Sequence, residues 1–377
     1  MISGVPTLED LPPLAGTRVL LRADFNVPLR DGEIVDDLRI RAALPTIRWL
    51  QGRGAQVVAC THLGRPKGKV DPRYSVEPVR ARLAELAPGV ELLENLRYHP
   101  GEEANDPAFV AELVDGFDAY VNDAFGASHR AHASIVGPPR FLPSAAGRLL
   151  AREVDVLVGL RTNPRRPFVA ILGGSKVSDK LRVIEALLDV ADELLIGGGM
   201  CFTFLAARGN GVGASLCEDD MVDACRALLD QHGDRLVLPS DITALGPGGE
   251  LMDPDAGGDV RQVGTTVPDG WTGVDIGPGT AADFGDRVAE ARTVFWNGPM
   301  GVFEDPRFES GTRAVAQAVA ETRAFTVVGG GDSAAALAQF GLADQVDHVS
   351  TGGGASLELL ERGDLPGLAV LRGEWTG

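Results

Sequence analysis

Short apolar runs, rich in β-branched residues, recur along the whole chain, and each stops at a glycine or a polar turn. A segment with helical periodicity follows most of them. Nearly continuous apolar strands that alternate with amphipathic helices are typical of parallel sheets covered on both faces. The nine runs are 17–24, 56–60, 119–123, 168–172, 193–196, 236–238, 293–296, 325–328 and 348–350. The pattern predicts an α/β fold, in which ligands bind beyond the carboxyl ends of the strands.

The residues at the predicted strand ends change character along the chain. Up to about residue 145 they are rich in arginine and histidine, and after about residue 165 they are rich in glycine. Between these parts, residues 146–159 have helical periodicity, and the loop 161–167 follows. We interpret this stretch as an interdomain helix and linker. Residues 246–273 are rich in Gly, Pro and Asp; we interpret them as a surface excursion and assign them no function.

Length and charge limit the classes of function. A chain of 377 residues is long enough for two domains, and 44% apolar with 23% charged residues is typical of a globular protein. The formal net charge of −18 makes the chain a poor general binder of nucleic acids or anionic membranes. Any site for a phosphorylated ligand must therefore be a local basic patch.

The beginning of the chain and its cysteines bear on location. The first residues carry acids and prolines without a basic region before an apolar run, so no signal peptide is expected. No apolar stretch reaches the ~18 residues that a membrane helix needs. Four cysteines lack a CxxC or zinc spacing, which favours a reduced, cytoplasmic protein.

Basic residues gather near the strand ends of the first half. Guanidinium groups bind phosphate and carboxylate oxygens bidentately, and Asp24 and Asn26 can orient hydroxyl groups. A ligand with a phosphate, a hydroxyl and a carboxyl end would suit such a site; the alternative is surface arginines in ordinary ion pairs. We interpret His129 and His132 as residues that hold local structure. The basic candidates are Arg22, Arg39, His62, Arg65, Arg97, His129, Arg130 and His132.

Glycine-rich turns follow four apolar runs of the second half. Glycine lets backbone N–H groups approach a phosphate, and the next helix adds its dipole. In the turn 329–332, Asp332 can hold Mg²⁺. Neither a Walker A loop nor a GxGxxG motif is present. Tight turns alone would also explain these glycines.

Two of the four lysines, Lys176 and Lys180, lie close together in a chain with 31 arginines. They are four residues apart, and we expect them to lie at the start of a helix, on one face, where they can contact neighbouring phosphates. The alternative is that both simply lie in solvent.

Eight segments taken together resemble the phosphoglycerate kinase family, and they occur in the family's order across almost the whole chain. They are RADFNVP (22–28), THLGRP (61–66), ENLR (94–97), VNDAFG (121–126) with HRAH (129–132), GGSKVSDK (173–180), WNGPMGVFE (296–304), GGGD (329–332) and STGGGASLELLE (350–361).

The resemblance implies two doubly wound, Rossmann-like parallel-sheet domains joined by an interdomain helix. The first domain (1–146) would bind 3-phosphoglycerate, 147–161 would form the helix and hinge, and 162–362 would bind nucleotide. The tail, 363–377, would return to the first domain. The implied protein is a monomeric, cytoplasmic enzyme of glycolysis.

The resemblance also implies a role for individual residues. Those implied to bind 3-phosphoglycerate are Asp24, Asn26, Arg39, His62, Arg65, Arg97 and Arg130. Those implied to bind ADP or ATP are Lys180, Glu304, Gly330, Gly331, Asp332 and Ser333, with Asp332 also serving Mg²⁺. Those implied to meet the transferred phosphoryl group are Arg39, Lys176, Gly352, Gly353 and Gly354.

The sequence departs from the family pattern at two places. Ser333 stands where the family usually has threonine, which keeps the hydroxyl. Around 79–93 the family usually has a further strand and most of a helix, so we expect the first sheet to lack an edge unit.

The implied reaction is 1,3-bisphosphoglycerate + ADP ⇌ 3-phosphoglycerate + ATP. It needs positioning and charge stabilisation rather than a covalent intermediate or a strong base, which fits the absence of an obvious Ser-His-Asp or Cys-His set. Two half-sites on separate domains would require a hinge closure. Two alternatives stay open: a paralogue that phosphorylates another carboxylate, and a non-catalytic nucleotide-binding protein.

Overall fold

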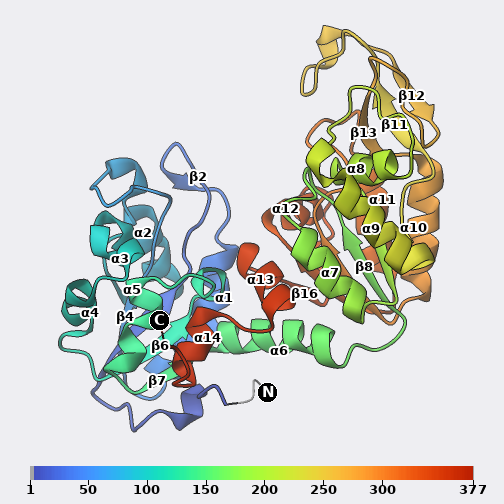
Figure 1. Ribbon diagram of the computed structural model, residues 1–377. Helices are drawn as coiled ribbons and strands as arrows, with labels where there is room; N and C mark the ends of the chain where they lie inside the picture. Colours follow the sequence, from blue (N-terminus) through green and yellow to red (C-terminus); the bar gives the residue numbers. More distant parts are fainter. Residues whose placement is uncertain (1–3, 377) are drawn as a thin grey trace. The chain divides into compact units, whose positions relative to one another are not determined.

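The computed structural model describes residues 4–376, which form two compact units (Figure 1). One unit comprises the described residues of 1–158 together with those of 354–377, and the other comprises 159–353. The chain crosses between the units within α6 (Arg148–Thr162) and again after Gly353. Each unit has its own parallel sheet and its own core.

The first unit is built on a five-stranded parallel sheet of order β5-β4-β1-β6-β7. From β1 the chain adds β4 and then β5 on one side of the sheet, and it later adds β6 and β7 on the other side. The switch point therefore lies between β1 and β6. The strands are β1 (Arg18–Ala23), β4 (Gln56–Cys60), β5 (Glu91–Leu92), β6 (Ala119–Asp123) and β7 (Ser144–Ala146), with a hairpin of β2 (Leu29–Arg30) and β3 (Glu33–Ile34).

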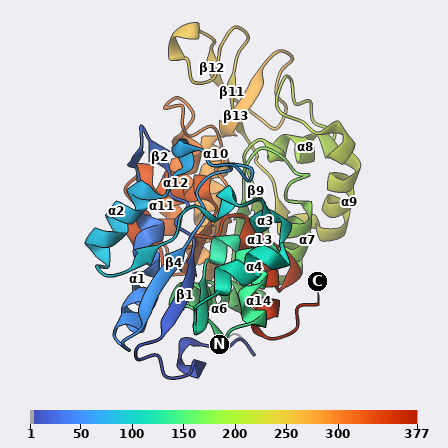
Figure 2. The ribbon, with the colours of Figure 1, turned by 90° about the vertical axis from the view of Figure 1, so that its left-hand side faces the viewer.

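Helices cover both faces of this sheet because alternate side chains of its buried strands point to opposite sides. Val19 and Leu21 pack with α1 and α2, whereas Leu20 packs with α4 and α5. Figure 2 shows β1 and β4 side by side in this unit. The helices are α1 (Leu38–Gln51), α2 (Glu77–Leu86), α3 (Pro100–Ala104), α4 (Pro107–Val114), α5 (Ala133–Val136), α13 (Gly354–Arg362) and α14 (Pro366–Leu371).

The second unit has a six-stranded parallel sheet of order β10-β9-β8-β14-β15-β16, with its switch point between β8 and β14. The strands are β8 (Phe168–Leu172), β9 (Glu193–Ile196), β10 (Leu236–Val237), β14 (Thr293–Asn297), β15 (Phe325–Gly329) and β16 (His348–Val349). The helices are α7 (Leu181–Val190), α8 (Met200–Ala207), α9 (Val222–His232), α10 (Pro278–Glu290), α11 (Ser310–Glu321) and α12 (Gly331–Gln339). Helices α10, α11 and α12 share one core with β8, β14 and β15.

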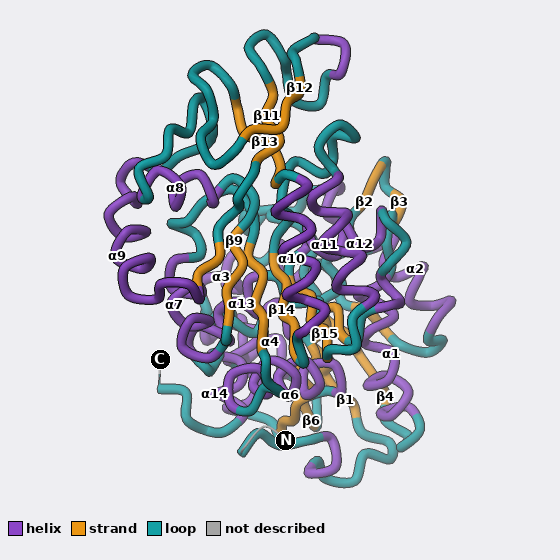
Figure 3. The backbone as a smooth tube through the Cα atoms, turned by 90° about the vertical axis from the view of Figure 1, so that its right-hand side faces the viewer, coloured by secondary structure: helices purple, strands orange, loops and turns teal. Residues whose placement is uncertain are grey.

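A three-stranded antiparallel sheet extends the second unit (Figure 3). Its strands are β11 (Ile242–Leu245), β12 (Val260–Val263) and β13 (Thr272–Ile276), in the order β12-β11-β13. Residues 246–273, expected to be a surface excursion, therefore contribute β12 and the first two residues of β13.

All nine predicted runs form strands of the two parallel sheets, which confirms the α/β, doubly wound prediction. Around 79–93, the structure forms most of α2 and the two-residue edge strand β5, which pairs with β4. One detail differs from the expectations. Residues 354–362, expected in the second domain, belong to the first unit as α13, which packs against the turn 125–127.

Candidate active site

The carboxyl edge of the first sheet brings together residues that lie far apart in the sequence. Asp24 follows β1 and His62 follows β4, and the Thr61 hydroxyl accepts a hydrogen bond from the Phe25 amide at 2.9 Å, which ties the two strand ends together. Arg39, in the first turn of α1, donates from its guanidinium to Asp24 Oδ2 at 2.5 Å. The His62 Nδ1 lies 4.0 Å from Asp24 Oδ1.

The neighbouring charges fix the protonation of this pair. Burial raises the pKa of Asp24, but the positive charges of Arg39 and Arg22 outweigh it, so the pKa of that carboxyl is lowered. Burial lowers the pKa of His62 well below its usual range. At neutral pH, Asp24 is therefore ionised and His62 neutral, and its Nδ1 accepts from the buried guanidinium of Arg22 at 3.2 Å.

The loop after His62 is braced from two sides. The Gly64 amide donates to Asn26 Oδ1 at 2.9 Å, and the Gly64 carbonyl accepts from Arg97 at 2.8 Å. Gly64 has φ +60, and a Cβ there would lie 2.3 Å from the Tyr74 ring, so the position requires glycine. Arg65 follows directly and its side chain is exposed.

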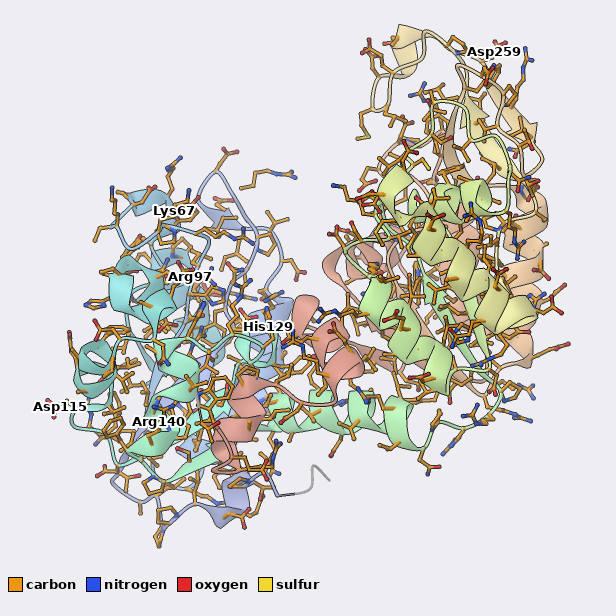
Figure 4. The ribbon with its side chains drawn as sticks, in the orientation of Figure 1. Lys67, Arg97, Asp115, His129, Arg140 and Asp259 are labelled. Carbon is orange, nitrogen blue, oxygen red and sulfur yellow. The ribbon has the colours of Figure 1, made fainter. Side chains whose placement is uncertain are left out.

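Arginine charge is concentrated beside this loop. Burial lowers the pKa of Arg97, and the charges of Arg130 and Arg22 add to that effect. Arg97 also contributes to lowering the pKa of His129; both are labelled in Figure 4. Burial and the three arginine charges lower the pKa of His132 to about 4. Glu103, whose carboxylate lies 3.3 Å from Arg97 Nε, opposes the lowering of the Arg97 pKa without cancelling it. The remaining positive charge suits an anionic ligand.

The switch point of the second sheet is occupied by Lys180. Its ammonium group donates to the Gly173 carbonyl at 2.6 Å, and to Asn297 Oδ1 and O at 2.6 and 3.3 Å. Gly173 follows β8 and Asn297 ends β14, so one side chain joins the two central strands. The expectation that Lys176 and Lys180 share a helical face is wrong, because α7 begins only at Leu181 and Lys180 caps it, while Lys176 lies exposed in the preceding loop.

The turn after β15 is hydrogen-bonded to the end of β14 and to the turn that follows β14. Asn297 Nδ2 donates to the Gly329 carbonyl at 2.8 Å, and the Gly298 amide donates to the Ser333 hydroxyl at 2.6 Å. Ser333 is fully buried, so its hydroxyl holds the turn after β14. Gly330 has φ +94 and caps α12, whose first residues, Gly331 and Asp332, are exposed.

A cavity of about 320 Å³ opens beside these turns. Its walls come from the ends of β8, β9 and β14 and from β13, and they are mostly glycine and apolar side chains, with Glu304 and Asp332 among the few charged ones. Burial lowers the pKa of Lys180 to about 8, although the charges of Asp332 and Asp179 oppose that shift. Such a cavity suits an apolar ring system with an anionic group at the glycine turns.

Asp332 is an exposed carboxylate at the cavity edge and is available for a metal ion. Among residues 4–376, no group of three or more His, Cys, Asp or Glu side chains could hold a metal ion by itself. Mg²⁺ is usually held by one or two carboxylates together with ligand phosphates and waters. The exposed Asp332 at the first turn of α12 therefore fits a Mg²⁺ that arrives with a phosphorylated ligand.

The remaining candidates are Lys176 and the glycines 352–354. Glu218 accepts bonds from the Val177 and Ser178 amides and so braces the loop of Lys176. Gly352 donates to the Ser350 hydroxyl at 3.2 Å, and Gly353 has φ +49. Gly354 begins α13, and the boundary between the units passes between Gly353 and Gly354.

Three residues at these places are not among those to which the resemblance gives a role. Arg22 stood among the basic candidates and Asn297 within a matching segment, but neither contact partner was visible in the sequence. Asp275, on β13, lines the cavity; burial raises its pKa to about 7 despite hydrogen bonds from the Gly311 and Ile276 amides. An acid within the apolar run 273–276 was the signal that could have found it.

Comparisons with known proteins agree with the resemblance. The sequence model of the family described as Phosphoglycerate kinase matches residues 8–91 and 87–363, and the two stretches meet within the shortened region. The phosphoglycerate kinase of Rubrobacter xylanophilus is 56% identical, covering 95% of this chain and 96% of that protein. The one from Salinispora arenicola is 52% identical, with 97% and 99% covered.

A solved structure shares the fold. The phosphoglycerate kinase of Coxiella burnetii superposes with a TM-score of 0.87 at 38% sequence identity, covering 97% of this chain and 98% of that one.

Proposed function

The chain belongs to the phosphoglycerate kinase family and is a phosphotransferase with phosphoglycerate kinase activity; on this basis we propose that each of its two units binds one of the two substrates. The reaction is the reversible transfer of a phosphoryl group from 1,3-bisphosphoglycerate to ADP, which gives 3-phosphoglycerate and ATP. The observation that carries the proposal is the pairing of an arginine cluster at one switch point with a glycine-lined cavity at the other.

The first unit supplies the 3-phosphoglycerate site. The arginine forks bind its phosphate and carboxylate oxygens, while Asp24 and Asn26 orient its hydroxyl group. The neutral His62 contributes a hydrogen bond rather than a charge. The residues of this site are Asp24, Asn26, Arg39, His62, Arg65, Arg97 and Arg130.

The second unit supplies the nucleotide site. The base and sugar occupy the cavity beside Glu304, and the phosphates lie at Lys180 and the amides of the turn 330–333. The buried Ser333 hydroxyl, which accepts a bond from the Gly298 amide, would hold the turn 330–333 in place beside the phosphates. The residues of this site are Lys180, Glu304, Gly330, Gly331, Asp332 and Ser333.

Asp332 is the residue that would hold Mg²⁺, in company with the nucleotide phosphates. An ion held there would supply positive charge that offsets part of the negative charge of the phosphates.

Transfer itself needs alignment and positive charge, not a base. The attacking carboxylate of 3-phosphoglycerate is already an anion, so no proton has to be removed. Arg39 of the first unit and Lys176 of the second, with the amides of Gly352, Gly353 and Gly354, stabilise the charge on the moving group. Because the two half-sites belong to different units, a hinge within 147–161 must bring them together and exclude water.

We also propose a cytoplasmic monomer. All four cysteines are free, and burial raises the pKa of each thiol, which suits a reducing compartment. Among the described residues, no helix has the length and apolar character that crossing a bilayer takes. Light scattering behind a sizing column should give the mass of one chain; a dimer mass would contradict the proposed state.

Separate binding titrations test the division of labour. We expect Arg97→Ala to weaken 3-phosphoglycerate at least tenfold and to leave ADP affinity within twofold. Lys180→Ala should do the reverse. If both variants weaken both ligands equally while their melting temperatures stay near wild type, the assignment of one ligand to each unit is wrong.

A further inference from the structure

One wall of the cavity in the second unit comes from the segment that follows β11. Leu251 lines the cavity and is 44% exposed. Leu216, 46% exposed, lines the same cavity. Two leucines that face water at a cavity mouth leave apolar surface for a ligand to cover.

The backbone on both sides of Leu251 is held by one ion pair. The Met252 amide donates to Asp305 Oδ2 at 2.9 Å, and Arg307 donates to the Glu250 carbonyl at 2.7 Å. Arg307 and Asp305 form a bidentate pair, with Nε to Oδ1 at 3.0 Å and the terminal nitrogen to Oδ2 at 2.7 Å. The pair thus fixes where Leu251 stands.

The Asp305–Arg307 ion pair, called the brace below, holds a backbone conformation that the chain would not otherwise favour. Met252 has φ +64, which is uncommon for a residue other than glycine and persists only where surrounding contacts determine it. Asp305 is 1% exposed although it is charged. Its bond to Arg307 lowers the pKa of Asp305 to about 2, so the pair stays ionised at working pH.

The same pair reaches the other wall of the cavity. Asp305 directly follows Glu304, which lines the cavity, and the guanidinium of Arg307 lies 4.8 Å from the ring centre of Phe308. Phe308 is fully buried in a small core with Leu245 and Val274, which belong to β11 and β13. One ion pair therefore ties the turn after β14 to the antiparallel sheet.

We propose that Leu251 is a specificity-determining residue that packs against the base of a bound nucleoside diphosphate or triphosphate, and that Asp305 and Arg307 are positioning residues that act through it. The proposal rests on the proposed function, because it takes the cavity as the nucleotide site. The antiparallel sheet then has a role: it carries an apolar wall for the base, away from the phosphates at the glycine turns.

Steady-state kinetics of Leu251→Ser and Asp305→Asn test this, with Asp259→Asn as the matched control. Asp259 pairs with Arg261 at 2.9 Å, two residues apart as in the brace, but both are exposed; Figure 4 labels Asp259. We expect both test variants to raise the KM for ADP and ATP about five- to tenfold, with kcat and the KM for 3-phosphoglycerate within twofold of wild type. The control should match wild type.

Inhibition by inorganic pyrophosphate separates a wall for the base from a general structural effect. Pyrophosphate has no base, so its inhibition constant should be unchanged in Leu251→Ser and Asp305→Asn. A parallel weakening of pyrophosphate and ADP would overturn the proposal. If Asp305→Asn does not fold, Leu251→Ser still decides, since an exposed leucine is not needed for folding.

Leu216→Ser distinguishes failure of this inference from failure of the nucleotide site. If Leu216→Ser weakens ADP but the two test variants behave like Asp259→Asn, the cavity binds nucleotide and the proposed role of Leu251 is wrong. If Leu216→Ser also leaves ADP unaffected, the cavity is not the nucleotide site and the inference falls with it.

Discussion

Buried ionisable side chains at both switch points are held by partners that lie far away in the sequence. Arg22 joins His62 across 40 positions and Lys180 joins Asn297 across 117. The resemblance to a family supplied most of the candidate site residues, because it matches residue types at strand ends. It did not reveal Arg22, Asn297 or the Asp305–Arg307 brace as partners, because such contacts depend on how the strands are ordered in the sheet.

The pKa of Lys180 predicts how nucleotide binding depends on pH. Burial lowers this pKa to about 8, so the ammonium group loses its proton, and its attraction for phosphate, as the pH rises through 8. We expect the dissociation constant of ADP to rise towards tenfold per pH unit between about pH 8 and 9.5. Calorimetric titrations across pH 7–9.5 measure it.

Binding of 3-phosphoglycerate to the same protein is the control, because its arginines keep their charge over this range. If the dissociation constant of ADP does not change up to pH 9.5, or changes with pH in the same way as that of 3-phosphoglycerate, the proposed role of Lys180 is wrong.

Asp275 predicts a pH dependence of stability with a definite sign. Burial raises its pKa from 3.8 to about 7, so the folded protein binds a proton that the unfolded chain has released between these values. Stability from this group is present below pH 4 and is lost as the pH rises through 7. Replacing Asp275 by Asn removes that loss.

Scanning calorimetry at pH 5 and pH 8 checks the sign. The difference in melting temperature, Asp275→Asn minus wild type, should be more positive at pH 8 by roughly 3–6 °C. A difference that is equal at both pH values, or larger at pH 5, would show that Asp275 is not protonated in the folded protein near neutral pH.

At the scale of elements, the apolar runs predicted the strands because buried parallel strands need apolar side chains on both faces. The antiparallel sheet was not predicted, because Gly, Pro and Asp around β12 are typical of loops and its pairing comes from tertiary context. The start of α7 was placed too early for a similar reason. Lys180 bonds to strand ends instead of extending the helix.

The N-terminus of α6 gives a prediction at this scale. Asp123 Oδ1 accepts from the Leu149 and Leu150 amides at 2.9 and 3.1 Å, and Asp123 is fully buried. Removing it leaves buried amides without a partner at the helix that links the units. Asp123→Ala should cost about 1–3 kcal/mol and speed hydrogen exchange at these two amides.

Asp106→Ala is the matched control, because Asp106 caps α4 in the same way from an exposed position. It should cost about 0.5–1 kcal/mol. Equal losses in the two variants, with unchanged exchange at Leu149 and Leu150, would show that Asp123 does not anchor α6.

At the scale of the whole molecule, the sequence indicated two domains but not where the last one ends. A glycine turn followed by helix 354–362 looks like one more strand-turn-helix unit of the second domain, yet that helix packs with the first. The apolar side chains of α14, among them Val370, likewise join the first unit's core. The chain therefore links the units twice, through α6 and after Gly353.

The division of substrates between units predicts compaction. With 3-phosphoglycerate and MgADP together, small-angle scattering should show a smaller radius of gyration than with either ligand alone, because transfer requires both half-sites to meet. An unchanged radius with both ligands bound at saturation would contradict hinge closure within 147–161.

The most direct test of the central claim, that this chain transfers a phosphoryl group between substrates held on two units, is a coupled assay. Purified protein with 3-phosphoglycerate and MgATP is followed through glyceraldehyde-3-phosphate dehydrogenase and NADH, beside Arg39→Ala and Lys176→Ala. We expect turnover in the range of about 1–10³ per second for the wild type. Both variants, one from each unit, should lose at least a hundredfold in kcat while remaining folded. Folded wild-type protein that binds both ligands without turnover, or variants with undiminished kcat, would contradict the account.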